Sequence, residues 1–133
     1  MAVIFVARSP SFSKWASDVG FSKHVFKVGV TEEPVKAVVQ AGWAGESDWT
    51  VVKKEDAQDL TENEVLERLA RKEKLIDPEY YPRLKGARGI FRVSATNVQN
   101  HILVSKALAG EDIGEVKLKP ADFAAYLIRN AIG

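Results

Sequence analysis

Short runs of β-branched and aromatic residues along the chain predict four strands. Residues 3–8 form the first run, and residues 24–30 form a second run that a lysine and a glycine interrupt. Such runs are typical of strands with a covered face, and the internal glycine indicates a bulge or the close approach of another backbone segment. Two further runs, at residues 49–53 and 89–93, are bounded by polar residues. We expect the first two strands to be antiparallel neighbours, with residues 49–53 in the same sheet.

Helix-start signals predict four helices between and after these strands. Thr31, followed by two glutamates and a proline, predicts a helix over residues 32–40. A threonine with a glutamate three residues later is a capping box, and it opens a second helix over residues 61–74. The same logic at Thr96 opens a third helix that ends near residue 110, and Pro120 opens the last one.

Together these elements predict an α+β fold with a small, mostly antiparallel sheet flanked by helices. The expected order is β, β, α, β, α, β, α, α, with a long loop at residues 9–23 whose aromatic side chains pack back onto the sheet. Residues 1–133 are expected to form a single domain, because a chain of 133 residues can bury a core without disulfides. The expected core includes Val28, Val38, Leu66, Leu69, Phe91, Ile102 and Leu127.

Composition narrows the class of protein. Hydrophobic residues make up 46% and charged residues 28% of the sequence, as in ordinary globular proteins. The absence of cysteine excludes disulfide frameworks, thiolate metal sites and cysteine nucleophiles. No apolar run approaches the length needed to span a bilayer and no signal-peptide pattern opens the chain, so we expect a cytoplasmic protein. A net charge of +1 argues against nucleic-acid binding by the whole surface, but it allows a local basic groove.

The two N-terminal strands also carry a pair of motifs. The chain reads Val3-Ile4-Phe5-Val6-Ala7-Arg8-Ser9 in the first and Lys27-Val28-Gly29-Val30-Thr31-Glu32-Glu33-Pro34 in the second. The pair resembles the signature strands of the GIY-YIG nuclease superfamily, in the phage-type branch whose second motif reads Lys-Ile-Gly-x-Thr-x-Asp-Pro. The resemblance covers about residues 3–93 and implies that family's small sheet, with two added C-terminal helices at about residues 96–132.

The resemblance implies a DNA-cutting site whose parts are incomplete here. Members of the family share a tyrosine on each signature strand and an arginine on the following helix. The tyrosine positions fall on Phe5, which lacks a hydroxyl, and on Lys27, as in the phage-type branch. The arginine position falls on Ala37, beside Lys36, and neither residue reproduces the bidentate grip of a guanidinium on phosphate. Lys27 and Lys36 remain as candidate catalytic residues of an eroded site.

The resemblance also implies a glutamate on a later helix, which holds a divalent cation in members of the family. This position falls on Glu64 or Glu67 in the predicted helix 61–74. Because Glu64 already completes the capping box, Glu67 is the candidate catalytic carboxylate and the candidate ligand for Mg²⁺ or Mn²⁺. The alternative is that Glu67 lies on a solvated helix face.

Basic residues near the signature strands are candidates for contacts with DNA phosphates. They are Arg8, Lys23, Lys27 and Lys36. The alternative is that these side chains are simply solvated. No paired-ligand spacing links the two histidines, His24 and His101, which are therefore expected on the surface or on a helix face.

Three functions remain open from the sequence. The first is a GIY-YIG-like domain with an eroded catalytic site that binds DNA or a protein partner. The second is an active metal-dependent endonuclease in which Lys27, Lys36 and Glu67 replace the usual groups. The third is an interaction domain unrelated to nucleic acid. Salt-dependent DNA binding separates the first two from the third, and metal-dependent nicking separates the second from the first.

Overall fold

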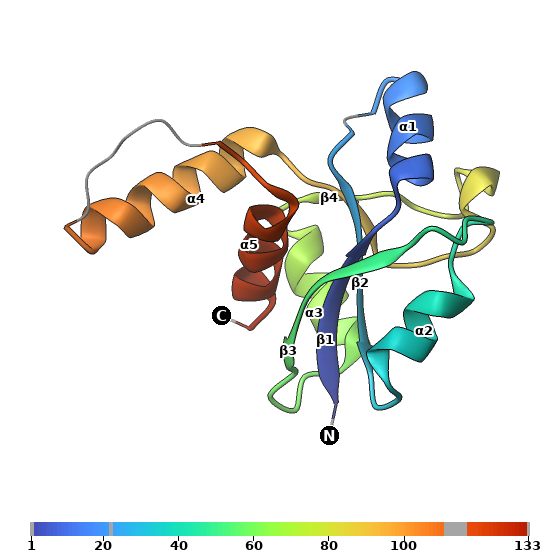
Figure 1. The fold of residues 1–133 in the computed structure, drawn as a ribbon, viewed down its shortest axis with the longest axis horizontal. Coiled ribbons are helices and arrows are strands. Elements are labelled where there is room, and N and C mark those ends of the chain that lie inside the picture. Colours follow the sequence, from blue (N-terminus) through green and yellow to red (C-terminus); the bar gives the residue numbers. More distant parts are fainter. Residues whose placement is uncertain (1, 22, 111–116, 133) are drawn as a thin grey trace.

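A five-stranded antiparallel sheet forms the centre of the protein in its computed structural model, which describes residues 2–21, 23–110 and 117–132 (Figure 1). The sheet and the helices make a mixed α+β fold, as the sequence predicts. The strand order is β3-β1-β2-β5-β4. The strands are β1 (Val3–Arg8), β2 (Val25–Thr31), β3 (Thr50–Asp56), β4 (Lys74–Leu75) and β5 (Ile90–Arg92).

Strand pairing confirms the expected arrangement of the first three strands. β1 pairs antiparallel with β2, so that Phe5 lies opposite Gly29 and Ala7 lies opposite Lys27. β3 pairs with the other edge of β1, with a register shift between Val6 and Ala7. Because side chains alternate between the two faces of a strand, this register places Phe5, Lys27 and Gly29 on one face.

Helices cover both faces of the sheet and enclose two hydrophobic cores. On one face, α3 (Glu62–Ala70) and α5 (Pro120–Ile132) pack against the alternate residues Ile4 and Val6 of β1. On the other face, α1 (Pro10–Asp18) and α2 (Val35–Ala41) pack against Phe5 and Ala7. A short 3₁₀ helix, η1 (Pro82–Leu84), adds Leu84 to this second core.

Most of the predicted core residues are buried. Val28, Leu69, Phe91 and Leu127 are fully inaccessible, and Leu66 is 6% exposed. The remaining two, Val38 and Ile102, are partly buried at the margins of the second and first cores. Ala70, the last residue of α3, is exposed.

The prediction of a long loop at residues 9–23 was wrong, because α1 occupies most of it. The Ser9 hydroxyl accepts a hydrogen bond from the Phe12 amide at 3.1 Å, and Pro10 occupies the first turn, where no amide partner is needed. Phe12 and Ala16 lie four residues apart and both are fully buried. The N-cap serine, the proline and this spacing were readable signals of a helix.

Three other predicted boundaries were also wrong. α2 begins at Val35 rather than at residue 32, because the Thr31 hydroxyl accepts from the Glu33 amide in a turn that precedes Pro34. α3 ends at Ala70, and the chain then forms β4, which pairs with β5. The third predicted helix is α4 (Ala95–Leu108), and its cap is Ser94 rather than Thr96.

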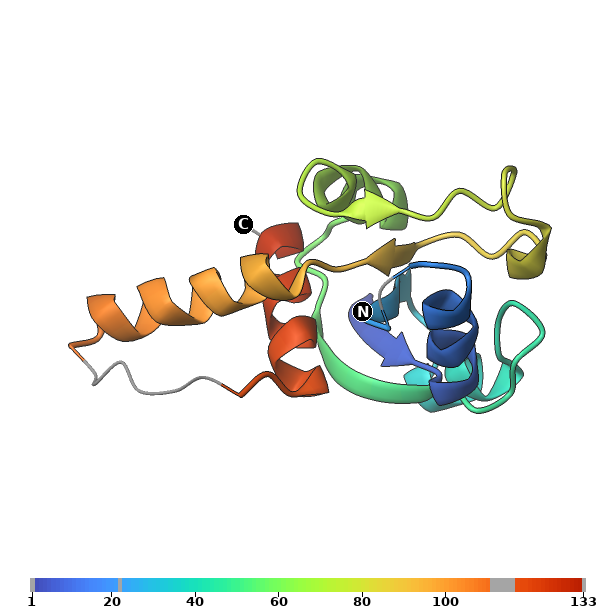
Figure 2. The ribbon, with the colours of Figure 1, turned by 90° about the horizontal axis from the view of Figure 1, so that it is seen from above.

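The two C-terminal helices attach in different ways. α5 contributes Phe123, Leu127 and neighbouring apolar residues to the first core. α4 extends away from the sheet in both views (Figures 1 and 2), and Val98 is its buried side chain. Near its C-terminal end, Val104 is 58% exposed and Leu108 is 84% exposed. α4 therefore depends on its first turns for attachment to the body of the protein.

Candidate functional site

Lys27 lies inside the protein, on the face of the sheet that α1 and α2 cover. Its side chain is 5% exposed, and its Nζ lies 5.2 Å from the centre of the Trp43 ring. Nζ donates a hydrogen bond to the carbonyl oxygen of Val28 at 3.1 Å. Burial lowers the pKa of Lys27 to about 8, although Glu62 acts in the opposite direction. The ammonium therefore lies in an aromatic environment rather than at a basic surface.

The backbone around Lys27 explains the glycine of the second motif. A Cβ on Gly29 would lie 2.7 Å from Cζ of Phe5 and 3.1 Å from Oε1 of Glu62. The same Glu62 oxygen accepts a hydrogen bond from the Val30 amide at 3.2 Å, beyond the last pair of β2 with β5. Phe5 and Glu62 thus fill the space over the strand in which a larger residue would stand.

The candidate catalytic residues do not meet in one cleft. Lys36 is exposed on α2, as is the neighbouring Ala37. Glu67 is exposed on α3, where it forms an ion pair with Arg71 at 3.2 Å. Within the described residues, Lys27, Lys36 and Glu67 make no hydrogen bond or ion pair with one another. Nor does any group of three or more histidine, aspartate and glutamate side chains in these parts of the chain converge as metal ligands do.

A pocket at one end of the sheet gathers four basic residues, and we call it the basic pocket. It is lined by Arg8 at the end of β1, Lys14 on α1, and Lys23 and His24 just before β2. Its volume is about 450 Å³, within the range of small-ligand sites. Arg8 and Lys23 were candidates from the sequence and lie together here. Lys14 and His24 were missed, and Lys27 and Lys36 are not part of the lining.

The floor of the basic pocket is built from aromatic rings. The His24 ring stacks on Phe123 of α5, with centroids 4.5 Å apart. The Phe26 ring lies on the Phe123 ring as well, with centroids 5.3 Å apart, and both phenylalanines are buried. His24 is therefore held in the lining of the pocket and is partly buried.

The electrostatics of the basic pocket are those of an anion site. Burial lowers the pKa of His24, and Lys23 and then Arg8 lower it further by charge repulsion. Among the described residues of the lining, Asp18 is the one carboxylate. The three permanent cations therefore outnumber the acidic side chain, and an incoming anion would meet a positive local potential.

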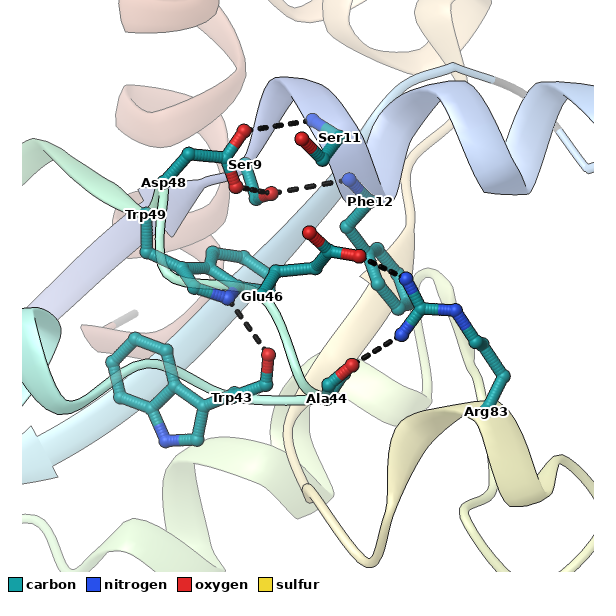
Figure 3. Close-up of polar contacts among 9 residues, drawn as sticks. All are labelled: Ser9, Ser11, Phe12, Trp43, Ala44, Glu46, Asp48, Trp49 and Arg83. Carbon is teal, nitrogen blue, oxygen red and sulfur yellow. Dashed lines mark hydrogen bonds and ion pairs between the residues drawn. The ribbon is translucent and has the colours of Figure 1, made fainter.

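A network of polar contacts fixes α1, which forms one wall of the basic pocket (Figure 3). The Asp48 carboxylate accepts hydrogen bonds from the Ser9 hydroxyl and from the Ser11 amide, the latter at 2.9 Å. The bond from Ser9 is the main cause of the lowered pKa of Asp48. A carboxylate at this position also interacts favourably with the positive end of the helix dipole. Asp48 thereby anchors the start of α1 to the segment before β3.

A second set of contacts ties the same segment to η1. The Arg83 guanidinium donates hydrogen bonds to the Ala44 carbonyl and the Glu46 carboxylate (Figure 3). It also lies over the Phe12 and Trp15 rings at 5.8 and 5.7 Å. These contacts join segments that are distant in the sequence, so hydrophobic patterning alone gives no sign of them.

The opposite end of β1 and β2 is acidic. Glu32, Asp56 and Asp59 line a second pocket there, of about 620 Å³, beside the start of β1. Glu33 and Glu55 line an adjoining hollow. The two ends of the sheet therefore carry charge of opposite sign, although the net charge of the chain is only +1.

No protein-family model matches the chain, and comparison with curated proteins and with solved structures found no match. In the described part of the chain, no helix has the length and apolar character required to cross a membrane.

Proposed function

We propose that the protein is a GIY-YIG-like domain that binds DNA through its phosphates without cutting it. The observation that carries this proposal is the convergence of Arg8, Lys14, Lys23 and His24 on one pocket. Lysine and arginine side chains neutralise DNA phosphates, and such contacts need a shared face rather than a catalytic geometry. The basic pocket provides that face in a chain with little overall charge.

Several features argue against cleavage. Phe5 lacks the hydroxyl of the family motif, and Ala37 lacks the guanidinium. Lys27 is buried beside the Trp43 ring, while Lys36 and Glu67 are exposed on two different helices. A metal-assisted phosphoryl site needs its charged groups within contact distance of one scissile phosphate. The rearranged nuclease is therefore the less favoured proposal.

The test is DNA binding as a function of salt. We expect the affinity for a labelled duplex with single-stranded ends to fall as salt is raised, with a slope of about 0.9 for each neutralised phosphate. The double variant Arg8→Gln, Lys23→Gln should bind about tenfold more weakly or worse, with a slope reduced by about 2.

Lys72→Gln is the matched control, because Lys72 is exposed and lies outside the basic pocket. It removes one positive charge and should leave both affinity and slope near those of the parent. Equal weakening by the control would mean that the basic pocket is not the binding site. Absence of salt-sensitive binding by the parent would favour an interaction domain instead.

A further inference from the structure

We infer that the basic pocket holds a single nucleotide unit through a terminal phosphate monoester. This inference rests on the proposed function and adds the chemical class of ligand that the pocket selects. The ligand has two sources, the phosphorylated end of a DNA strand and a free nucleoside monophosphate. Both present the same chemistry to Arg8, Lys14 and Lys23.

Size is the first argument. The pocket is bounded by β1, α1, the start of β2 and the beginning of α5, and it ends on the buried rings of Phe26 and Phe123. A volume of about 450 Å³ accommodates a small ligand but not a duplex, whose backbone phosphates lie along a continuous surface. A strand end or a separate nucleotide is able to enter.

Charge is the second argument. Among the described residues that line the pocket, three cations and one carboxylate, Asp18, leave a surplus of two positive charges when His24 is neutral. A phosphate monoester carries between one and a half and two negative charges near neutral pH, roughly twice the charge of an internal phosphodiester. The surplus therefore matches a terminal phosphate better than an internal one.

The apolar part of the lining is the third argument. Pro10, Leu118 and Pro120 line the pocket together with the two phenylalanines. An inorganic phosphate would leave this surface unused, whereas the sugar and base of a nucleotide would cover it. A lining that combines apolar side chains with a few charged groups is typical of sites that orient a small organic ligand.

The experiment compares one oligonucleotide duplex with single-stranded ends in three forms. The strand ends carry a 5′-phosphate, a 3′-phosphate or only hydroxyl groups, and a closed circular DNA without ends is a fourth ligand. We expect a terminal phosphate of at least one polarity to strengthen binding about tenfold or more over the hydroxyl form, as a charge-assisted contact does. The Arg8→Gln, Lys23→Gln variant should lose this gain, and Lys72→Gln should keep it. Thermal unfolding of each variant checks that the fold is retained.

Competition with a nucleoside monophosphate separates the two sources. Displacement of the phosphorylated strand at similar concentrations would assign the pocket to the free nucleotide, and no displacement would assign it to the strand end. Equal binding of phosphorylated, unphosphorylated and circular DNA would overturn the inference and leave DNA binding intact. Binding of the monophosphate without any DNA binding would support the pocket's ligand class and overturn the proposed function. Failure of every ligand would overturn both.

Discussion

The Lys27 side chain is buried, whereas most lysine side chains in proteins are exposed to solvent. Its Nζ donates a hydrogen bond to the Val28 carbonyl and lies over the Trp43 ring. Burial disfavours the charged form, and this is why its pKa falls to about 8. Lys27 is thus removed from solvent, so its charge acts on the stability of the fold rather than on a surface ligand.

This position predicts a pH dependence of stability. An unfolded lysine titrates near pH 10.4, so between about pH 8 and pH 10 the unfolded chain binds more protons than the folded one. The free energy of unfolding therefore rises with pH between about pH 8 and pH 10. Below about pH 8 the lysine is charged in both states, so the cost of burying its charge does not change with pH. Replacing Lys27 by Met should raise the free energy of unfolding at pH 7 by on the order of 1–3 kcal/mol.

Urea denaturation of the parent and Lys27→Met at pH 7, 8.5 and 10 measures this effect. The difference between the two proteins should shrink as pH rises. Lys36→Met is the matched control, because the same substitution on the exposed face of α2 should change stability by no more than about 0.5 kcal/mol at any of these pH values. A constant difference across the pH range, or a variant less stable than the parent at pH 7, would contradict the pKa assigned to Lys27.

At the scale of single elements, α4 illustrates how a helix can be held by one carboxylate. Glu73 is 5% exposed and accepts hydrogen bonds from the Ser94 amide at 2.6 Å and from the Asn97 side chain at 2.8 Å. The Tyr126 hydroxyl of α5 donates to the same carboxylate at 2.8 Å. Burial and this hydrogen bond raise the pKa of Tyr126 to about 12. Glu73 therefore joins the first turn of α4 to α5 and to the end of α3.

Replacing Glu73 by Gln should destabilise the protein by about 1–3 kcal/mol, because an amide accepts fewer of these hydrogen bonds and places its own donors against the existing ones. Amide hydrogen exchange should accelerate in the first turn of α4 more than in β1 or β2. Glu33→Gln, at an exposed turn, is the control and should leave both measurements unchanged. An equal acceleration throughout the sheet would show that Glu73 supports the whole fold rather than the attachment of α4.

At the scale of the whole molecule, charge is separated along the sheet. The basic pocket lies at the end of β1, and Glu32, Asp56 and Asp59 lie near its beginning. A polyanion approaching the protein is attracted to one end and repelled from the other, so the separation orients the encounter. A chain with a net charge of +1 is in this way able to present a localised anion site.

We predict that the protein does not cleave DNA, because the candidate catalytic residues lie on several elements and do not meet in one site. Plasmid DNA incubated with the protein and Mg²⁺ or Mn²⁺ should show no more nicking than DNA in the same buffer alone. A catalytic hydroxyl or guanidinium contributes about 10²–10⁴-fold in enzymes that have one, and Phe5 and Ala37 carry neither group. Nicking by the parent that disappears in Glu67→Ala would instead identify Glu67 as a metal ligand and support the rearranged nuclease.

The sequence by itself determined the local elements whose signals are short in range. Alternating apolar runs specified β1, β2 and β3, and a threonine–glutamate capping box specified the start of α3, where both reciprocal contacts form. It also specified most of the core, because Val28, Leu69 and Leu127 follow the periodicity of their elements. These features depend on neighbours within a few residues, and a single sequence contains that information.

Only the tertiary structure decided what the charged residues do. Arg8, Lys14 and His24 come together because β1, α1 and β2 meet at one end of the sheet, whereas Lys27 points into the opposite face and is buried there. β4 escaped prediction for a similar reason, since its two residues form a strand by pairing with β5. Exposure, pKa and the grouping of charges depend on contacts between residues that are distant along the chain. Local sequence patterns do not specify which distant residues come into contact, so the candidate site is defined only by the folded protein.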